Sequence, residues 1–152
     1  MPFFEPLGKE VQSAFDKYTH NFVRRLKKPE AMKMFVNEYK LSDEQASEMF
    51  DIFDIDKNGE LSIWEYQQFY AALGDCPQDV FDLFNKVQKS DGSGFVDMER
   101  AWDALKEIKT KNDRVLTEVE LEQFLQNGTD ENKEIDIKRF INIIVRIKTY
   151  RR

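Results

Sequence analysis

The sequence predicts an all-α fold of about eight helices. Apolar residues recur every three or four positions along most of the chain, and this spacing places them on one face of a helix. Two short patterns mark where helices begin, because Ser42 with Gln45 and Thr117 with Glu120 each have the spacing of a capping box. No segment alternates long enough to predict a strand of normal length, so helices would form the core.

The expected helices follow one another along the chain with polar or Gly-containing breaks between them. An apolar stripe from Leu7 to Leu26 predicts the first helix, and Pro29 suits the first turn of the second. Later helices are separated by the segments DIDKNGELS, GDCPQ, KSDGSG, KTKNDR and NGTDENKE. The pairs Phe95–Val96 and Ile135–Ile137 are expected to add very short extended segments inside two of these loops.

Charge is distributed unevenly over the chain. The net charge is −6, and residues 41–75 contain nine Asp/Glu residues against one Lys57. Such an acidic block indicates a cation site in this part of the chain. The overall negative charge argues against a nucleic-acid-binding protein, since these proteins carry a basic excess.

The stretch DIDKNGELSIWE, residues 54–65, carries oxygen-bearing side chains at alternate positions. Asp54, Asp56 and Asn58 stand at the first, third and fifth positions of this segment. Gly59 follows at the sixth, where a sharp turn would require a backbone conformation that is costly for other residues. The segment therefore predicts a loop that folds its polar side chains around one point.

The second half of the same stretch supplies the remaining candidate ligands. We expect Glu60 to offer its main-chain carbonyl, Ser62 its hydroxyl or a bound water, and Glu65 both carboxylate oxygens. A shell of about seven oxygen ligands suits Ca²⁺. The absence of soft ligands argues against zinc or copper.

The spacing of residues 54–65 resembles the EF-hand loop. The flanking segments LSDEQASEMFDIFD and YAALGDCPQDVFDLF resemble parts of calmodulin and troponin C-like proteins. This resemblance implies helix–loop–helix hands paired in two lobes, with one Ca²⁺ bound by Asp54, Asp56, Asn58, Glu60, Ser62 and Glu65. It divides the chain into N-terminal helices at 1–40 with a possible vestigial hand, paired hands at 41–108, and a degenerate C-terminal hand at 109–152.

The other candidate loops depart from the pattern. In the segment 88–100, Lys89 and Arg100 fall at the first and last ligand positions when Gly94 is the sixth. The preceding helix fits better with Gln88 at the first position, in a loop that is one residue longer. We interpret this segment as a metal-free loop in which Phe95 or Val96 pairs with Leu61. The alternative is a rearranged weak site that uses the remaining oxygen donors, which are Asp91, Ser93, Asp97 and Glu99.

Three further segments fit the loop spacing less well. Segment 128–139 has Lys133 where glycine belongs and Arg139 at the last position, which argues against metal binding. Segment 109–120 has lysines at ligand positions and is interpreted as a linker entering a capped helix. Segment 16–27 is either a vestigial hand or part of one continuous helix.

The resemblance implies a Ca²⁺ sensor that binds a helical target peptide or protein. The alternatives are a Ca²⁺-independent scaffold with a structural Ca²⁺ site and a cytosolic Ca²⁺ buffer. No enzyme is expected, because His20 is the only histidine and no phosphate-binding glycine loop is present. The single cysteine, Cys76, and the lack of a secretory signal or a long apolar run favour a cytoplasmic protein without stable membrane insertion.

Overall fold

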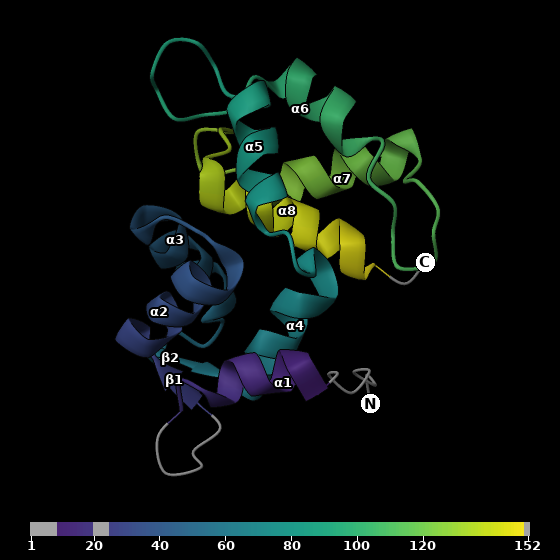
Figure 1. The fold of residues 1–152 in the computed structure, drawn as a ribbon. Helices are drawn as coiled ribbons and strands as arrows, with labels where there is room; N and C mark the ends of the chain where they lie inside the picture. Colours follow the sequence, from purple (N-terminus) through teal and green to yellow (C-terminus); the bar gives the residue numbers. More distant parts are fainter. Residues whose placement is uncertain (1–8, 20–24, 151–152) are drawn as a thin grey trace. The chain divides into compact units, whose positions relative to one another are not determined.

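The structure, a computed structural model, describes residues 9–19 and 25–150. Within these residues it contains eight helices and one two-stranded sheet, so the predicted all-α fold is confirmed (Figure 1). The chain forms two compact units, Met1–Pro77 and Gln78–Arg152. The boundary falls inside the segment 41–108, and the assignment of sequence segments to individual hands stays a prediction.

The first unit consists of helices joined by loops that carry two very short strands. Its elements are α1 (Lys9–Asp16), β1 (Arg25–Lys27), α2 (Lys28–Tyr39), α3 (Asp43–Phe53), β2 (Glu60–Ser62) and α4 (Ile63–Leu73). The predicted capping box at the start of α3 is confirmed, since Ser42 Oγ accepts from the Gln45 N–H and Gln45 Oε1 accepts from the Ser42 N–H. Pro29 lies in the first turn of α2, as the sequence predicts.

The strands β1 and β2 join the two loops of the first unit. They run antiparallel with Leu26 opposite Leu61, and both leucine side chains are buried. The loop before α2 therefore pairs with the loop before α4, as in a pair of hands. The alternative of one continuous helix over 16–27 is wrong, because α1 ends at Asp16 and β1 is extended. His20 lies outside the described residues.

The predicted pairing of Leu61 with Phe95 or Val96 is also wrong. Leu61 is paired with Leu26, and the Val96 N–H donates to the Ile135 carbonyl at 3.0 Å. Leu61 and Val96 are therefore each paired with a residue from the other loop of the same unit. Val96 forms an isolated bridge with Gln88, whereas Ile137 already begins α8, so no strand forms over Ile135–Ile137.

Helices α2 and α3 pack directly against each other in the first unit. Lys28 on α2 adds an ion pair across this contact, with its Nζ 3.3 Å from Asp51 Oδ1 on α3. The same ammonium lies 5.5 Å from the centre of the Phe50 ring. Helix α2, which follows β1, and helix α3, which precedes the loop 54–65, are therefore held together.

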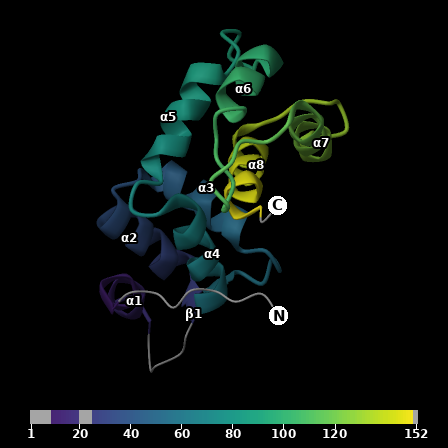
Figure 2. The ribbon, with the colours of Figure 1, turned by 90° about the vertical axis from the view of Figure 1, so that its right-hand side faces the viewer.

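The second unit repeats this order of helices. Its elements are α5 (Gln78–Val87), α6 (Met98–Leu105), α7 (Glu118–Gly128) and α8 (Ile137–Thr149). Helix α5 packs on α6 and on α8, and α7 packs on α8, an arrangement visible in Figures 1 and 2. The second predicted capping box is confirmed, because Thr117 and Glu120 exchange both hydrogen bonds at the start of α7.

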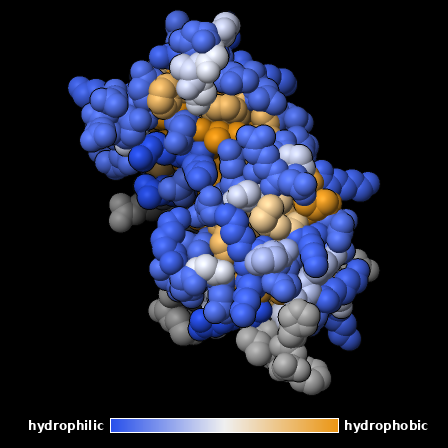
Figure 3. Space-filling view, turned by 90° about the vertical axis from the view of Figure 1, so that its left-hand side faces the viewer, coloured by the Kyte–Doolittle hydropathy of each residue, from blue (hydrophilic) through white to orange (hydrophobic). Residues whose placement is uncertain are grey.

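The surface is mainly hydrophilic on the face drawn in Figure 3, with smaller hydrophobic areas between the polar side chains. Large apolar residues that are exposed among the described residues are Ile55, Trp64, Met98, Val115 and Val119. No helix in the described part of the chain is both long and apolar enough to cross a membrane.

Candidate metal centre

The loop 54–65 begins where α3 ends. Asp54 is the C-cap residue of α3, and its side chain is buried inside the loop. Its Oδ1 accepts the Asn58 N–H at 3.2 Å and its Oδ2 accepts the Gly59 N–H at 3.0 Å. The two backbone donors hold this carboxylate at the centre of the turn, where a first ligand is expected.

The turn itself depends on left-handed backbone at two positions. Gly59 has a φ of +80°, and a side chain at this position would meet no atom within 4 Å. Glycine is therefore favoured here by the backbone angle and not by lack of space. Lys57 also has a positive φ, of 56°, and its Nζ donates to the Asp51 carbonyl at 2.7 Å.

Glu65 lies in the first turn of α4 and reaches back across the loop. Its Oε1 accepts the Ser62 N–H and its Oε2 accepts the Ile55 N–H, both at 2.8 Å. Ser62 Oγ accepts the Glu65 N–H in return at 3.1 Å, which completes a capping box. Glu65 is 7% exposed, and the two bonds to its side-chain oxygens fix a nearly buried carboxylate against the beginning of the loop.

Three of the predicted ligands converge. Asp54, Asp56 and Glu65 each offer a carboxylate oxygen, and the three oxygens lie within 4.8 Å of one another. Asn58 lies next to them, since its Nδ2 donates to Asp56 Oδ2 at 3.3 Å. Three like charges so close together repel one another, and a hard divalent cation is the partner that would offset this repulsion. The donor set therefore fits Ca²⁺ chemically.

The remaining predicted ligands lie in β2. Glu60 begins the strand, and its N–H donates to Asn58 Oδ1 at 2.9 Å, so the amide oxygen of Asn58 turns toward the backbone. Ser62 ends the strand, and its hydroxyl caps α4. The structure brings the three carboxylates together, and the roles of all six residues as ligands stay predictions.

The loop 88–100 is held by its own side chains. Asp97 caps α6 by accepting the N–H groups of Glu99 and Arg100, each at 3.1 Å. Asp91 Oδ1 accepts the Ser93 N–H at 2.9 Å, and hydrogen bonds from Ser93 lower the pKa of Asp91. The three carboxylates among the donors proposed for a weak site, Asp91, Asp97 and Glu99, do not converge on one point. Within residues 9–19 and 25–150, the group around Asp54 is the one such cluster.

Lys89 places a positive charge between the two loops of the second unit. Its Nζ lies 3.3 Å from Glu134 Oε2, which belongs to the loop 128–139. In that loop, Asp130 Oδ1 accepts the N–H groups of Asn132 at 2.8 Å and Glu134 at 2.9 Å. The Lys89 ammonium thus neutralises Glu134, and backbone N–H groups satisfy Asp130. In the same unit, Arg100 and Arg139 stand at the last ligand positions of the two loops.

Packing also leaves no room for a ligand side chain at the first position of the loop 128–139. Gly128 holds that position, and a Cβ added there would lie 2.6 Å from Ile143 Cγ1 on α8. Ile143 is buried, so it has little space to move away. A side chain of any kind at position 128 would therefore disturb the contact between α7 and α8.

Arg114 gives the segment 109–120 a cation whose partner the spacing of the sequence does not predict. Its guanidinium donates to Glu120 Oε1 at 2.9 Å and to Oε2 at 2.8 Å, and its centre lies 5.8 Å from the Tyr150 ring. This paired contact lowers the pKa of Glu120 to about 2. The lysines of this segment could have suggested that Glu120 is paired with a cation. That the cation is Arg114 depends on the turn at Asp113, whose φ is 61°.

Comparison with known proteins gives a partial match. No model of a protein family matches the chain. The chain is similar to "Probable calcium-binding protein CML23" of Arabidopsis thaliana, with 37% identity over 75 residues, which is 43% of this chain and 47% of that protein. The chain thus spans about half the length of this curated relative. The match supports the resemblance to the EF-hand family that the loop 54–65 and the paired helices indicate.

Proposed function

We propose that this protein binds one Ca²⁺ in the loop 54–65 and regulates a protein partner in response. The observation that supports the proposal most directly is the convergence of the Asp54, Asp56 and Glu65 carboxylates within 4.8 Å. Asn58, the Glu60 carbonyl and Ser62 would complete the oxygen shell. The similarity to a probable calcium-binding protein supports the same ion.

The regulatory part of the proposal rests on Glu65 and on the helix contact beside the loop. Glu65 lies in the first turn of α4, so an ion that draws its carboxylate inward would also move this turn of the helix. Helices α2 and α3 are packed together and joined by the Lys28–Asp51 ion pair. Binding that separates these helices would expose apolar side chains of the first unit to a partner helix.

Calorimetric titration of Ca²⁺ tests the metal site. We expect one ion per chain, with a Kd of about 10⁻⁵ M at the weak end of the range for sensor sites. Glu65→Gln should weaken binding at least about tenfold, because one of two charged ligand oxygens is lost. Glu44→Gln, an exposed substitution in the first turn of α3, is the matched control and should leave binding unchanged. Two ions per chain, or equal binding by both variants, would contradict the assignment.

A constitutive scaffold is the second candidate function. It is favoured by Lys89, Arg100 and Arg139, which leave the second unit without a cluster of carboxylates in its described residues. In this case Ca²⁺ stabilises the first unit and does not change its surface. Chemical shifts of the first unit separate the two functions, since a sensor shows changes across α2 and α3 on adding Ca²⁺ and a scaffold shows them at the loop alone.

A further inference from the structure

The end of α3 supplies a backbone acceptor to the loop 54–65. Asp51 lies in the last turn of α3, where the carbonyl groups have no N–H donor further along the same helix. In a longer helix the Asp51 carbonyl would accept the Ile55 N–H, but this N–H donates to Glu65 Oε2 at 2.8 Å. The Asp51 carbonyl instead accepts from Lys57 Nζ at 2.7 Å. The side chains of Glu65 and Lys57 therefore bind the donor and the acceptor of one helical bond that α3 does not form.

Lys57 also contacts the turn through its backbone. Its φ of 56° lies in the left-handed region, which residues with a side chain rarely adopt. Its N–H donates to the Asp54 carbonyl at 3.1 Å, and the N–H groups of the next two residues, Asn58 and Gly59, donate to the Asp54 carboxylate. The placement of Lys57 therefore affects the two donors that orient the first candidate ligand.

Asp51 is held by a second lysine from a different element. Lys28 on α2 places its Nζ 3.3 Å from Asp51 Oδ1, whereas Lys57 bonds to the backbone carbonyl of the same residue. The two lysines thus use different groups of Asp51, and a substitution of its carboxylate leaves the acceptor of Lys57 in place. This arrangement makes the two contacts separable by experiment.

The charge of Lys57 and its hydrogen bond act on a cation site in opposite directions. An ammonium group in the same loop as the three carboxylates repels a cation, so loss of the charge alone would strengthen Ca²⁺ binding. Loss of the hydrogen bond frees the turn, and the turn then has to be ordered when the ion binds, which weakens binding. Lys57 is exposed, so water and salt screen its repulsion. We therefore expect the hydrogen bond to have the larger effect.

We propose that Lys57 is a positioning residue of the Ca²⁺ site. Its ammonium, bonded to the Asp51 carbonyl, holds the turn of the loop against the end of α3, and this loop carries the carboxylates that converge on one point. Lys57 supplies no ligand itself, because an ammonium group has only donors. The inference rests on the proposed binding of Ca²⁺ in the loop 54–65.

Two substitutions of Lys57 test its role by calorimetric titration of Ca²⁺. Lys57→Met removes the ammonium and keeps an unbranched side chain, and we expect Ca²⁺ binding to weaken about three- to tenfold. Lys57→Arg keeps a charged donor, and its affinity should stay within about twofold of the wild type. The direction for Lys57→Met is decisive, because a role through charge alone would strengthen binding, and a role in overall stability alone would leave the affinity unchanged.

Lys40 provides a matched control in the first unit. It is exposed, it is the C-cap residue of α2, and its φ of 60° is close to that of Lys57. Lys40→Met therefore makes the same change of charge at the same kind of backbone position, and it should not weaken Ca²⁺ binding. A second control uses Asp51→Asn, which removes the carboxylate but keeps the carbonyl, so Lys57→Met should weaken binding by the same factor in this background.

Amide hydrogen exchange in chelator tests the same contact without the metal. We expect Lys57→Met to increase the exchange rates of the Asn58 and Gly59 amide protons about threefold or more, because the turn that holds these donors on Asp54 opens more often. Lys40→Met and Lys57→Arg should leave both rates near those of the wild type.

Equal or tighter Ca²⁺ binding by Lys57→Met would overturn the proposal, as would equal weakening by Lys57→Met and Lys40→Met. Unchanged exchange of the Asn58 and Gly59 protons in Lys57→Met would do the same. If the wild type takes up no Ca²⁺, it is the proposed function that fails, and the exchange rates in chelator decide separately whether Lys57 holds the turn.

Discussion

The hydroxyl oxygens of Tyr39 and Tyr66 lie 2.6 Å apart in the core of the first unit. Tyr66 donates its proton to the Val11 carbonyl at 3.1 Å, so Tyr39 is the donor in the bond between the two hydroxyls. This chain of hydrogen bonds connects α2 and α4 to α1. Tyr66 follows Glu65 in the sequence, so the helix that carries the last candidate ligand is anchored to the first helix of the chain.

Removing the central hydroxyl of this chain should cost more than removing the outer one. Tyr66→Phe removes both bonds of this chain and leaves the buried Tyr39 hydroxyl without its acceptor, so we expect a loss of about 1–3 kcal/mol in the free energy of unfolding. Tyr39→Phe keeps the bond from Tyr66 to Val11, and should cost about 0.5–1.5 kcal/mol. Urea denaturation of both variants measures which loss of unfolding free energy is larger. A larger loss for Tyr39→Phe would contradict the assigned donors.

Alkaline pH should destabilise the first unit through Tyr39. Burial raises the pKa of Tyr39 well above its usual value of 10.0, and the hydrogen bond with Tyr66 adds to this shift. The unfolded chain loses the Tyr39 proton near pH 10 whereas the folded chain keeps it. The stabilising contribution is therefore fully present below pH 10 and is lost as the pH rises further. The wild-type protein should lose stability more steeply than Tyr39→Phe in denaturation experiments from pH 9 to 11.

Acid should remove the contribution of the Arg114–Glu120 pair. The guanidinium lowers the pKa of Glu120 from 4.5 to about 2, so the folded state binds this proton less readily than the unfolded state. The contribution is present above pH 4.5 and is lost as the pH falls to about 2. We expect Arg114→Gln to be less stable than wild type at neutral pH, with a difference that disappears near pH 2.

Two controls make the acid experiment specific. Glu118→Gln removes an acidic group from the same turn of α7 without touching Arg114, and should not reproduce the pH dependence. Arg114→Lys keeps the charge but cannot form two parallel hydrogen bonds, so its stability should be intermediate. If the stability of Arg114→Lys equals that of the wild type at every pH, the two parallel hydrogen bonds add nothing to the charge interaction, which would contradict this expectation.

The Lys28–Asp51 ion pair should oppose Ca²⁺ binding if the ion separates α2 from α3. Lys28→Gln removes the pair, and we expect the Ca²⁺ affinity to rise about two- to fivefold, since exposed pairs contribute up to about 1 kcal/mol. Lys33→Gln, which lies on the same helix, serves as the control for the change in net charge. Equal affinities for wild type and Lys28→Gln would indicate that the helices stay together and would favour the scaffold function.

Local features of the fold were predictable from the sequence. The capping boxes at Ser42 and Thr117 are found where predicted, because a cap depends on residues only three positions apart. The spacing of Asp54, Asp56 and Glu65 likewise brings their carboxylates together within one loop. In both cases the interacting groups belong to a single turn or loop, so periodicity and spacing carry the information.

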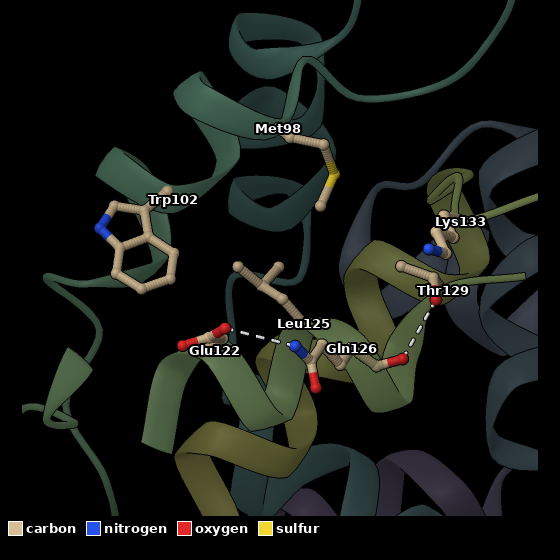
Figure 4. A pocket seen from close by; sticks show the side chains of 7 residues that line it. All are labelled: Met98, Trp102, Glu122, Leu125, Gln126, Thr129 and Lys133. Carbon is tan, nitrogen blue, oxygen red and sulfur yellow. Dashed lines mark hydrogen bonds between the residues drawn. The ribbon is translucent and has the colours of Figure 1, made fainter. Parts of the chain in front are cut away.

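Features that depend on distant segments were not predictable in the same way. The stripe from Leu7 to Leu26 fits a helix, yet Leu26 lies in a strand because Leu61 supplies the matching edge. Trp102 on α6 and Leu125 on α7 line one pocket of the second unit from separate helices (Figure 4), and no short pattern records that relationship. Arg114 was missed for a similar reason, since its contact with Glu120 depends on how the backbone turns between them.

The close approach of Gly128 to Ile143 limits how a metal site could be engineered into the last loop. An aspartate placed at position 128 would first meet the Ile143 side chain, so this side chain would have to shift before the carboxylate could act as a ligand. A design would therefore combine the aspartate with a smaller residue at position 143, and the core packing lost there would offset part of the stability that a bound ion supplies.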